Sequence, residues 1–297
     1  METVLKTTNI VKKYGNRTIL NKISMHIHKG DIYGFIGKNG AGKTTFMRVV
    51  LSLTPSNEGD VEFFDHQSIH QVGLKVGSLI EAPGLYKNAS AYENLKRFSI
   101  LYGADDSKIQ EILELVGLGN TGDRKAKDFS LGMRQRLGIA IALLGDPEFL
   151  LLDEPINGLD PEGIKEIRDT IVKLNKEKNI TFLISSHLLD ELSKIVTRYG
   201  IIDNGVLIEE IDAEQLKEKC KNRFIFEVDN SEKAAKVISK EIPKEEIVVK
   251  KNSIEIHSHF KDTALINKQL VEAGVLVSAM YSNADSLEEY FMKRIGG

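Results

Sequence analysis

The chain has 297 residues, of which 41% are hydrophobic and 28% charged, and its net charge is −3. These values are typical of a soluble globular protein with room for two domains, and the small net charge excludes a general attraction to nucleic acid or anionic lipid. The start METVLKTTNI has no apolar signal core, and no segment approaches the ~20 apolar residues that span a bilayer. Because Cys220 is the only cysteine, an internal disulfide is impossible. We therefore expect a cytoplasmic protein, in which any membrane role is played through a partner.

The first 53 residues predict short strands that lead into a phosphate-binding loop. Strand-like runs alternate with turns as far as the apolar run 32–36, which suits a buried strand. The sequence GKNGAGKT follows at 37–44 and opens a predicted helix at 45–53. Between a strand and a helix, this pattern indicates a cradle for nucleotide phosphates.

Each residue type in this loop has a physical task. The glycines let the backbone turn back and expose its amide hydrogens at a helix N-terminus, whose partial positive charge favours phosphate. Lys43 adds a full positive charge for the β- and γ-phosphates, and the Thr44 hydroxyl is a ligand for Mg²⁺. The alternative is a glycine-rich turn that binds nothing. The predicted nucleotide contacts are Gly37, Asn39, Gly40, Gly42, Lys43, Thr44 and Thr45.

Residues 58–211 predict alternating strands and helices, with a mostly helical stretch at about 84–145. This alternation implies an α/β fold with a parallel sheet covered by helices. The expected strands are 61–64, 76–80, 149–152 and 180–185, with a hairpin at 199–211 that turns at Asn204 and Gly205. The expected helices are 91–102, 107–116, 133–144, 162–177 and 186–197.

A second, smaller α+β domain is expected at 224–297, after a first domain at 1–212 and a charged linker at 213–223. Its predicted order is strand, helix, strand, strand, helix, strand, which is the ferredoxin-like order, and a last helix starts at Ser286. His257 and His259 share one side of a predicted strand, but the sequence offers no evident third metal ligand, so a solvated face is favoured over a metal site.

Two carboxylates follow the apolar strand in the sequence FLLLDE at 149–154. Ligands bind at the carboxyl ends of strands in α/β sheets. We expect Asp153 to hold Mg²⁺ through water and Glu154 to orient the water that attacks the γ-phosphate, because phosphoryl transfer depends mainly on positioning and charge neutralisation. The alternative is a polar cap where the strand meets a loop.

With these motifs in this order, residues 1–212 resemble the nucleotide-binding subunit of an ABC transporter. The resemblance implies a P-loop NTPase fold of ABC type, with a helical subdomain at about 84–145, that binds and hydrolyses ATP with Mg²⁺. It implies a second ATPase subunit, either another copy or a paralogue, and integral-membrane permease subunits. It therefore places the protein on the inner face of the cell membrane, and no nucleic-acid partner is expected.

The resemblance assigns roles to four further residues. Tyr14 matches an aromatic that stacks on adenine, although tyrosine also suits a half-buried strand. In FSLGMRQ at 129–135, Ser130 and Gly132 match the signature loop that closes over ATP held by the other subunit. That loop departs from the family's usual sequence, and an ordinary capped helix start is the alternative. Asp160 in NGLD matches a residue that touches the partner subunit, and it is also an expected N-cap.

Two more positions complete the predicted site. His187 in SSHLLDE matches the switch histidine that contacts the γ-phosphate and the attacking water, although a lone histidine is more often a satisfied polar residue. Glu81 stands where the family normally has glutamine, and an ionised glutamate only accepts hydrogen bonds and adds negative charge. We expect Glu81 to serve in catalysis, as a Mg²⁺ ligand and in the coupling of ATP hydrolysis to transport. The substitution resembles the subgroup that exports bacitracin-type and lantibiotic peptides and protects against them.

Two other classes of protein share the phosphate loop. A soluble ABC-type ATPase that acts on ribosomes or nucleic acid usually carries two ATPase halves or long coiled-coil insertions, and the sequence has neither. A P-loop kinase of small molecules would need neither the signature loop nor the switch histidine. A transporter ATPase is therefore the favoured interpretation.

Overall fold

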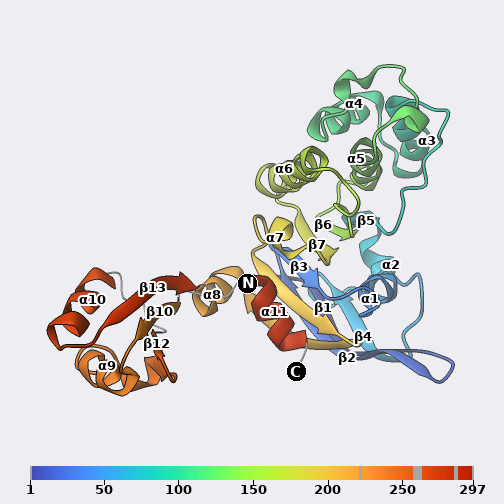
Figure 1. Ribbon diagram of the computed structural model, residues 1–297. Helices are drawn as coiled ribbons and strands as arrows, with labels where there is room; N and C mark the ends of the chain where they lie inside the picture. The colour runs from blue at the N-terminus through green and yellow to red at the C-terminus, as the bar shows by residue number, and fades with distance from the viewer. Residues whose placement is uncertain (1, 221–222, 257–262, 284–286, 296–297) are drawn as a thin grey trace. The chain divides into compact units, whose positions relative to one another are not determined.

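The computed structural model describes residues 2–220, 223–256, 263–283 and 287–295. The chain divides into two compact units, Met1–Ala213 and Glu214–Gly297 (Figure 1). The predicted histidine pair His257 and His259, and Ser286 at the start of the last predicted helix, lie outside the described residues. No helix in the described ranges has both the length and the apolar composition needed to span a bilayer.

A six-stranded sheet forms the centre of the first unit. In spatial order its strands are β5 (Val76–Leu79), β6 (Phe149–Asp153), β7 (Thr181–Ser186), β3 (Ile32–Ile36), β8 (Arg198–Asp203) and β9 (Val206–Asp212). All neighbours pair in parallel except β8 and β9, which are antiparallel. Strands β3, β6 and β7 are buried along their whole lengths, which is why the sequence shows them as continuous apolar runs. The predicted α/β fold is confirmed.

The predicted hairpin at 199–211 is formed by β8 and β9. Asp203 pairs with Val206, so Asn204 and Gly205 are the two turn residues. Both have left-handed backbone angles, with φ of 46° and 77°. A two-residue turn of this kind requires positive φ, which Asn and Gly adopt most readily.

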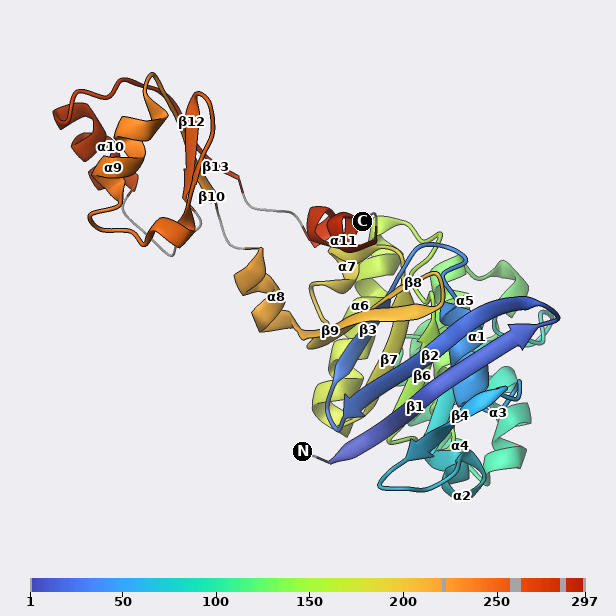
Figure 2. The ribbon, with the colours of Figure 1, turned by 90° about the horizontal axis from the view of Figure 1, so that it is seen from below.

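A second, three-stranded antiparallel sheet lies in front of the first in Figure 2. In spatial order it consists of β2 (Arg17–His28), β1 (Thr3–Tyr14) and β4 (Glu58–Phe63). The sequence predicted several short strands here, whereas β1 and β2 are continuous. Their pairing shifts register around Asn9, which has φ of 50°. Such irregularities break the alternation of apolar and polar residues, so one long strand resembles several short ones.

Helix α1 (Lys43–Val50) joins the two sheets through a shared apolar core. The ring of Phe46 on α1 lies 5.1 Å from that of Phe35 on β3, and Phe63 on β4 lies 6.4 Å from Phe149 on β6, measured between centroids. All four side chains are fully buried. This packing fixes the loop between β3 and α1, which is the predicted phosphate loop.

Figure 1 shows four helices gathered at one end of the first unit: α3 (Ala91–Tyr102), α4 (Asp106–Leu115), α5 (Leu131–Ala142) and α6 (Pro161–Lys178). The short helices α2 (Ile69–Val72) and α7 (Leu189–Leu192) lie nearer the sheets. The predicted helices at 91–102, 107–116, 133–144 and 162–177 are confirmed to within two residues at each end. Their N-caps explain the agreement, because Ser90, Asp105, Ser130 and Asp160 each accept a backbone hydrogen bond at the helix start.

The predicted helix at 186–197 is wrong for most of its length, because only α7 is helical there. Ser186 belongs to strand β7, and its Oγ accepts a hydrogen bond from the amide of Leu188 at 2.9 Å. At the other end, the amide of Thr197 donates to the carbonyl of Ile32 at 2.9 Å. Ser186 also pairs with Ile36 on β3, so contacts with β3 hold both ends of the segment.

The second unit contains a four-stranded antiparallel sheet with the ferredoxin-like connectivity, as predicted. In spatial order its strands are β11 (Ile247–Val249), β12 (Ser253–Ile256), β10 (Arg223–Val228) and β13 (Val277–Asn283), and α9 (Ser231–Ile238) and α10 (Thr263–Glu272) pack on the sheet. Two further helices belong to this part of the chain, α8 (Ala213–Lys219) and α11 (Leu287–Ile295). They meet where Lys219 Nζ donates to the Tyr290 hydroxyl at 3.3 Å.

Candidate active site

A cleft of about 300 Å³ opens where the phosphate loop meets the carboxyl end of β6. It brings seven of the predicted site residues together from segments far apart in the sequence. Two residues that were not predicted, Arg17 and Ile19, also lie on it. The lining consists of Arg17, Ile19, Asn39, Gly40, Gly42, Lys43, Thr44, Thr45 and Glu154.

Two glycines give the phosphate loop its path. A Cβ atom at Gly37 would lie 2.4 Å from the carbonyl oxygen of Ile202, so no larger residue fits without movement. Gly42 is the N-cap of α1 and has φ of 110°, a left-handed conformation that favours glycine. The loop therefore turns tightly into α1, and the first amides of that helix are directed to the cleft, where they favour an anion.

The Gly37→Ala substitution is expected to lower the free energy of unfolding by about 1–3 kcal/mol, the usual cost of forcing an extra methyl group into a filled space. Urea unfolding followed by circular dichroism measures this change. Gly84→Ala is the matched control, because nothing lies within 4 Å of a Cβ atom at Gly84. Equal stability of the two variants would contradict the expected clash at Gly37.

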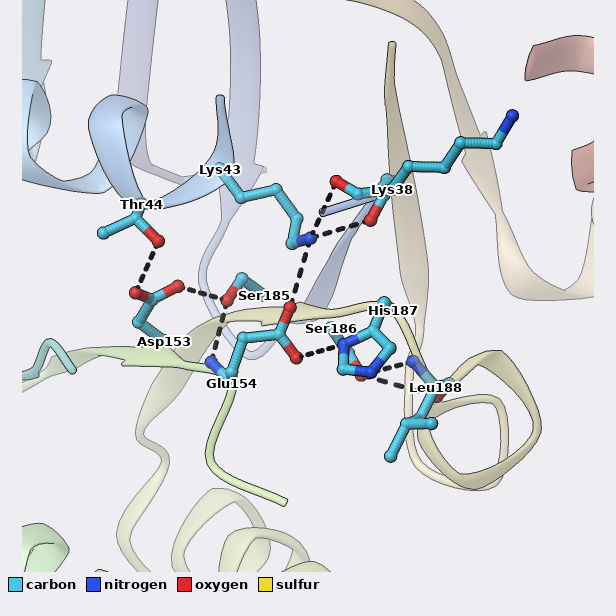
Figure 3. Close-up of polar contacts among 10 residues, drawn as sticks. Lys38, Lys43, Thr44, Asp153, Glu154, Ser185, Ser186, His187 and Leu188 are labelled. Atoms are coloured by element: carbon cyan, nitrogen blue, oxygen red, sulfur yellow. Dashed lines mark hydrogen bonds and ion pairs between the residues drawn. The ribbon is translucent and has the colours of Figure 1, made fainter. Parts of the chain in front are cut away.

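Lys43 is buried in the cleft and its charge is compensated. Its Nζ donates to the carbonyl oxygens of Gly37 at 2.7 Å and Lys38 at 3.3 Å. It also forms an ion pair with Glu154 Oε1 at 3.1 Å, and its side chain is only 5% exposed (Figure 3). A buried ammonium needs such partners, and these contacts aim its charge into the phosphate cradle.

Thr44, Asp153 and Ser185 form a set of oxygen atoms beside the cradle (Figure 3). The Thr44 hydroxyl donates to Asp153 Oδ2 at 2.7 Å, and the Ser185 hydroxyl donates to Asp153 Oδ1 at 2.6 Å. A hydroxyl and one carboxylate are the protein ligands that Mg²⁺ usually takes beside phosphate, with water in its other positions. The residues present therefore fit Mg²⁺.

Glu154 is held at both carboxylate oxygens. Opposite the Lys43 contact, Oε2 accepts a hydrogen bond from His187 Nδ1 at 2.8 Å, and the Glu154 amide donates to Ser185 Oγ at 2.8 Å (Figure 3). Glu154 also has φ of 48°, which is uncommon for a residue with a side chain. This conformation turns the carboxylate toward Lys43 and His187, where a general base for phosphoryl transfer is needed.

Eight predicted residues are absent from the lining of the cleft. Three of them, Gly37, Asp153 and His187, are bonded to residues that line it, whereas Tyr14, Ser130, Gly132, Asp160 and Glu81 lie apart. Tyr14 ends β1 with half of its surface exposed, and it is paired across the β1–β2 hairpin with Arg17, which does line the cleft. Ser130 caps α5 by accepting from the Met133 amide at 3.1 Å, and Gly132 follows it. Asp160 caps α6 by accepting from the Gly163 amide at 3.1 Å.

Glu81 also lies outside the lining of the cleft. It follows β5 with φ of 62°, and its carboxylate pairs with the guanidinium of Arg48 on α1. Its side chain is 60% exposed. Its predicted roles in catalysis and metal binding stay predictions.

Sequence reasoning missed the parts played by Arg17 and Ser185. Each is a cross-strand neighbour of a predicted residue, since Arg17 pairs with Tyr14 and Ser185 pairs with Asp153. The alignment of neighbouring strands is the signal that would have identified both residues. Once FLLLDE and LISSH are read as adjacent parallel strands, Ser185 falls beside Asp153.

Comparisons of the sequence and of the fold with known proteins agree with one another. The family model described as ABC transporter matches residues 20–157. The chain is 41% identical to the bacitracin transport ATP-binding protein BcrA of Enterococcus faecalis, over 100% of this chain and 98% of that protein. It is 45% identical to the lantibiotic transport ATP-binding protein SrtF of Streptococcus pyogenes, over 75% of this chain and 99% of that protein. Its fold matches a crystal structure of an ATP-binding cassette of an ABC transporter in the ADP conformation, with a TM-score of 0.65 and 29% identity over 72% of this chain and 92% of that one.

Proposed function

The chain belongs to the ABC transporter family as an ATP-binding subunit that hydrolyses ATP, and we propose that it powers a separate membrane permease. The proposed permease removes, or protects the cell against, a peptide antibiotic of the bacitracin or lantibiotic type. The observation that carries this proposal is the match along the whole chain, second unit included, to a bacitracin transport ATP-binding protein. The relatives named above are transport subunits, which does not favour action on ribosomes or nucleic acid.

We propose Glu154 as the general base of hydrolysis. Its carboxylate accepts a proton from water as the water oxygen attacks the γ-phosphorus, and the bond to the β–γ bridging oxygen breaks to give ADP and phosphate. Lys43 and His187 fix the two carboxylate oxygens, so the base is positioned before the reaction. Thr44 and Asp153 are the proposed holders of Mg²⁺, which when bound neutralises charge on the phosphates.

A second copy of the chain is proposed to complete the site. Ser130 and Gly132 at the start of α5, and Asp160 at the start of α6, line no part of the cleft that contains Lys43. They stand at helix N-termini, which favour anions. In the proposed pair, the N-terminus of α5 from one copy faces the phosphates held by the phosphate loop of the other. Tyr14 and Arg17 are proposed to contact the adenine end of the bound ATP.

Two measurements test this function: the antibiotic resistance that the chain confers, and the effect of a substitution at Glu81 on that resistance and on the ATPase rate. We expect a sensitive bacterium that expresses the chain with its permease to tolerate more bacitracin or lantibiotic than one that expresses the permease alone.

Glu81→Ala should lower this resistance by about tenfold and the ATPase rate of the purified chain by less than about threefold, because an exposed residue outside the cleft contributes little to the chemical step. Equal losses of resistance and ATPase rate would refute a role of Glu81 in coupling, and absence of any resistance would refute the proposed cargo.

A further inference from the structure

The hydroxyl group of Ser185 joins the two carboxylate residues of the active site. Ser185 lies in β7 and is fully buried. Its Oγ donates a hydrogen bond to Asp153 Oδ1 at 2.6 Å and accepts one from the Glu154 amide at 2.8 Å (Figure 3). One buried hydroxyl is therefore bonded both to a proposed holder of Mg²⁺ and to the proposed general base.

Glu154 departs from regular strand geometry, and Ser185 holds it there. Side chains of consecutive residues in a strand normally point to opposite faces of the sheet. Asp153 and Glu154 are consecutive, yet Asp153 contacts Thr44 of the phosphate loop. Glu154 contacts Lys43, the residue before Thr44. The chain leaves the strand geometry at Glu154, where φ is 48°. Such a conformation persists only where neighbouring groups hold it, and the bond from the Glu154 amide to Ser185 is one such contact.

The same hydroxyl fixes the direction of the Asp153 carboxylate. Asp153 is 5% exposed, its Oδ1 accepts from Ser185 and its Oδ2 accepts from Thr44. Ser185 lies directly opposite Asp153 in the last pair between β6 and β7. A hydroxyl is both a donor and an acceptor, whereas an apolar side chain at this position is neither. Without the hydroxyl, a buried carboxylate oxygen loses its donor, which is costly, and the carboxylate is free to turn away from Thr44.

We propose that Ser185 is a positioning residue that sets the affinity for Mg²⁺ through Asp153 and the rate of hydrolysis through Glu154. The inference rests on the proposed function, because it takes Asp153 as a metal holder and Glu154 as the base. The lining of the cleft does not include Ser185, so it acts through these two neighbours.

The first measurement is the steady-state rate of the Ser185→Ala variant, which loses the hydroxyl. We expect kcat at saturating ATP and Mg²⁺ to fall by about tenfold and the KM for ATP to change by less than about twofold, because the base is displaced while the phosphate loop is unchanged. In the Glu154→Gln background, Ser185→Ala should not lower the residual rate further, since both changes act through one base. Ser185→Thr keeps the hydroxyl and should restore kcat to within about threefold of the wild type.

The second measurement is the affinity for a non-hydrolysable analogue, adenylyl imidodiphosphate, by isothermal titration calorimetry with Mg²⁺ and with EDTA. Ser185→Ala should weaken binding by about two- to fivefold at limiting Mg²⁺, because Asp153 is no longer held toward Thr44. Binding in EDTA should be unchanged, since no metal takes part there.

Thr181→Val is the matched control, because it removes a buried hydroxyl from the other end of the same strand. Thr181 is fully buried and its Oγ1 accepts from the Gly30 amide at 3.0 Å. Both Thr181→Val and Ser185→Ala should unfold at a lower urea concentration than the wild type, since each leaves a buried group without its partner. Only Ser185→Ala should lower kcat and the affinity with Mg²⁺.

The proposal is overturned if Ser185→Ala has the wild-type kcat and the wild-type affinity with Mg²⁺, or if Thr181→Val loses as much of both. It is also overturned if Ser185→Thr is as slow as Ser185→Ala, or if Ser185→Ala slows the Glu154→Gln variant as much as it slows the wild type. If instead the wild type binds no nucleotide with Mg²⁺, the proposed function itself fails.

Discussion

Replacing Glu154 by Gln is expected to lower the rate of ATP hydrolysis by about 10²- to 10⁴-fold, which is the usual contribution of a general base. The amide keeps the shape of the side chain but accepts no proton from water. ATP binding should persist, because the phosphate loop, Thr44 and Asp153 are unchanged. Release of phosphate, measured with a coupled assay, gives the rate, and calorimetry gives the affinity.

The control for this substitution lies at the other end of the same strand. Glu148 precedes β6, pairs with Lys75 at 2.9 Å and is 41% exposed. Glu148→Gln makes the same chemical change outside the cleft, so its rate should remain within about twofold of the wild type, as for surface substitutions in general. Hydrolysis by Glu154→Gln at the wild-type rate would remove Glu154 from the role of base.

The Lys43→Ala substitution is expected to weaken the binding of ATP with Mg²⁺ by at least about 30-fold. Truncating one member of a buried, hydrogen-bonded charge pair costs about 2–5 kcal/mol of binding free energy, and about 2 kcal/mol corresponds to this factor. Lys43 is 5% exposed and makes contacts with Gly37, Lys38 and Glu154 that the methyl group of alanine cannot make. Calorimetric titration with the non-hydrolysable analogue measures the loss.

Lys38 gives a matched control within the same loop. Its side chain is exposed and only its carbonyl oxygen contacts Lys43, as Figure 3 shows. Lys38→Ala therefore removes one positive charge from the loop without touching the cleft, and its affinity should remain within about twofold of the wild type. If both variants lost affinity equally, the net charge of the loop would explain binding and the buried position of Lys43 would not.

The local parts of the site were predictable from the sequence. The spacing of glycines and lysine at 37–44 specifies a phosphate loop because each residue acts through its own backbone or charge. The apolar run before Asp153 and Glu154 indicates a buried strand with carboxylates at its end. In both cases the signal lies within about eight consecutive residues, so no tertiary information is needed.

Contacts between distant segments were not predictable in the same way. The ion pair of Lys43 with Glu154 and the ion pair of Arg48 with Glu81 depend on which strands become neighbours in the sheet. The segment 186–197 shows the same limit, because its ends are fixed by contacts of Ser186 and Thr197 with β3 rather than by its own helix propensity. Tertiary contacts overrode the local preference there.

We propose that each ATP is held between two copies of the chain, and the molar mass of the Glu154→Gln variant tests this most directly. Light scattering after gel filtration should give the mass of one chain, 33.2 kDa, without nucleotide and twice that mass with ATP and Mg²⁺. Adding Ser130→Arg to the variant should abolish the doubling, because a long cation would block the start of α5. A mass of one chain at saturating ATP and Mg²⁺, with calorimetry showing that ATP is bound, would contradict the claim.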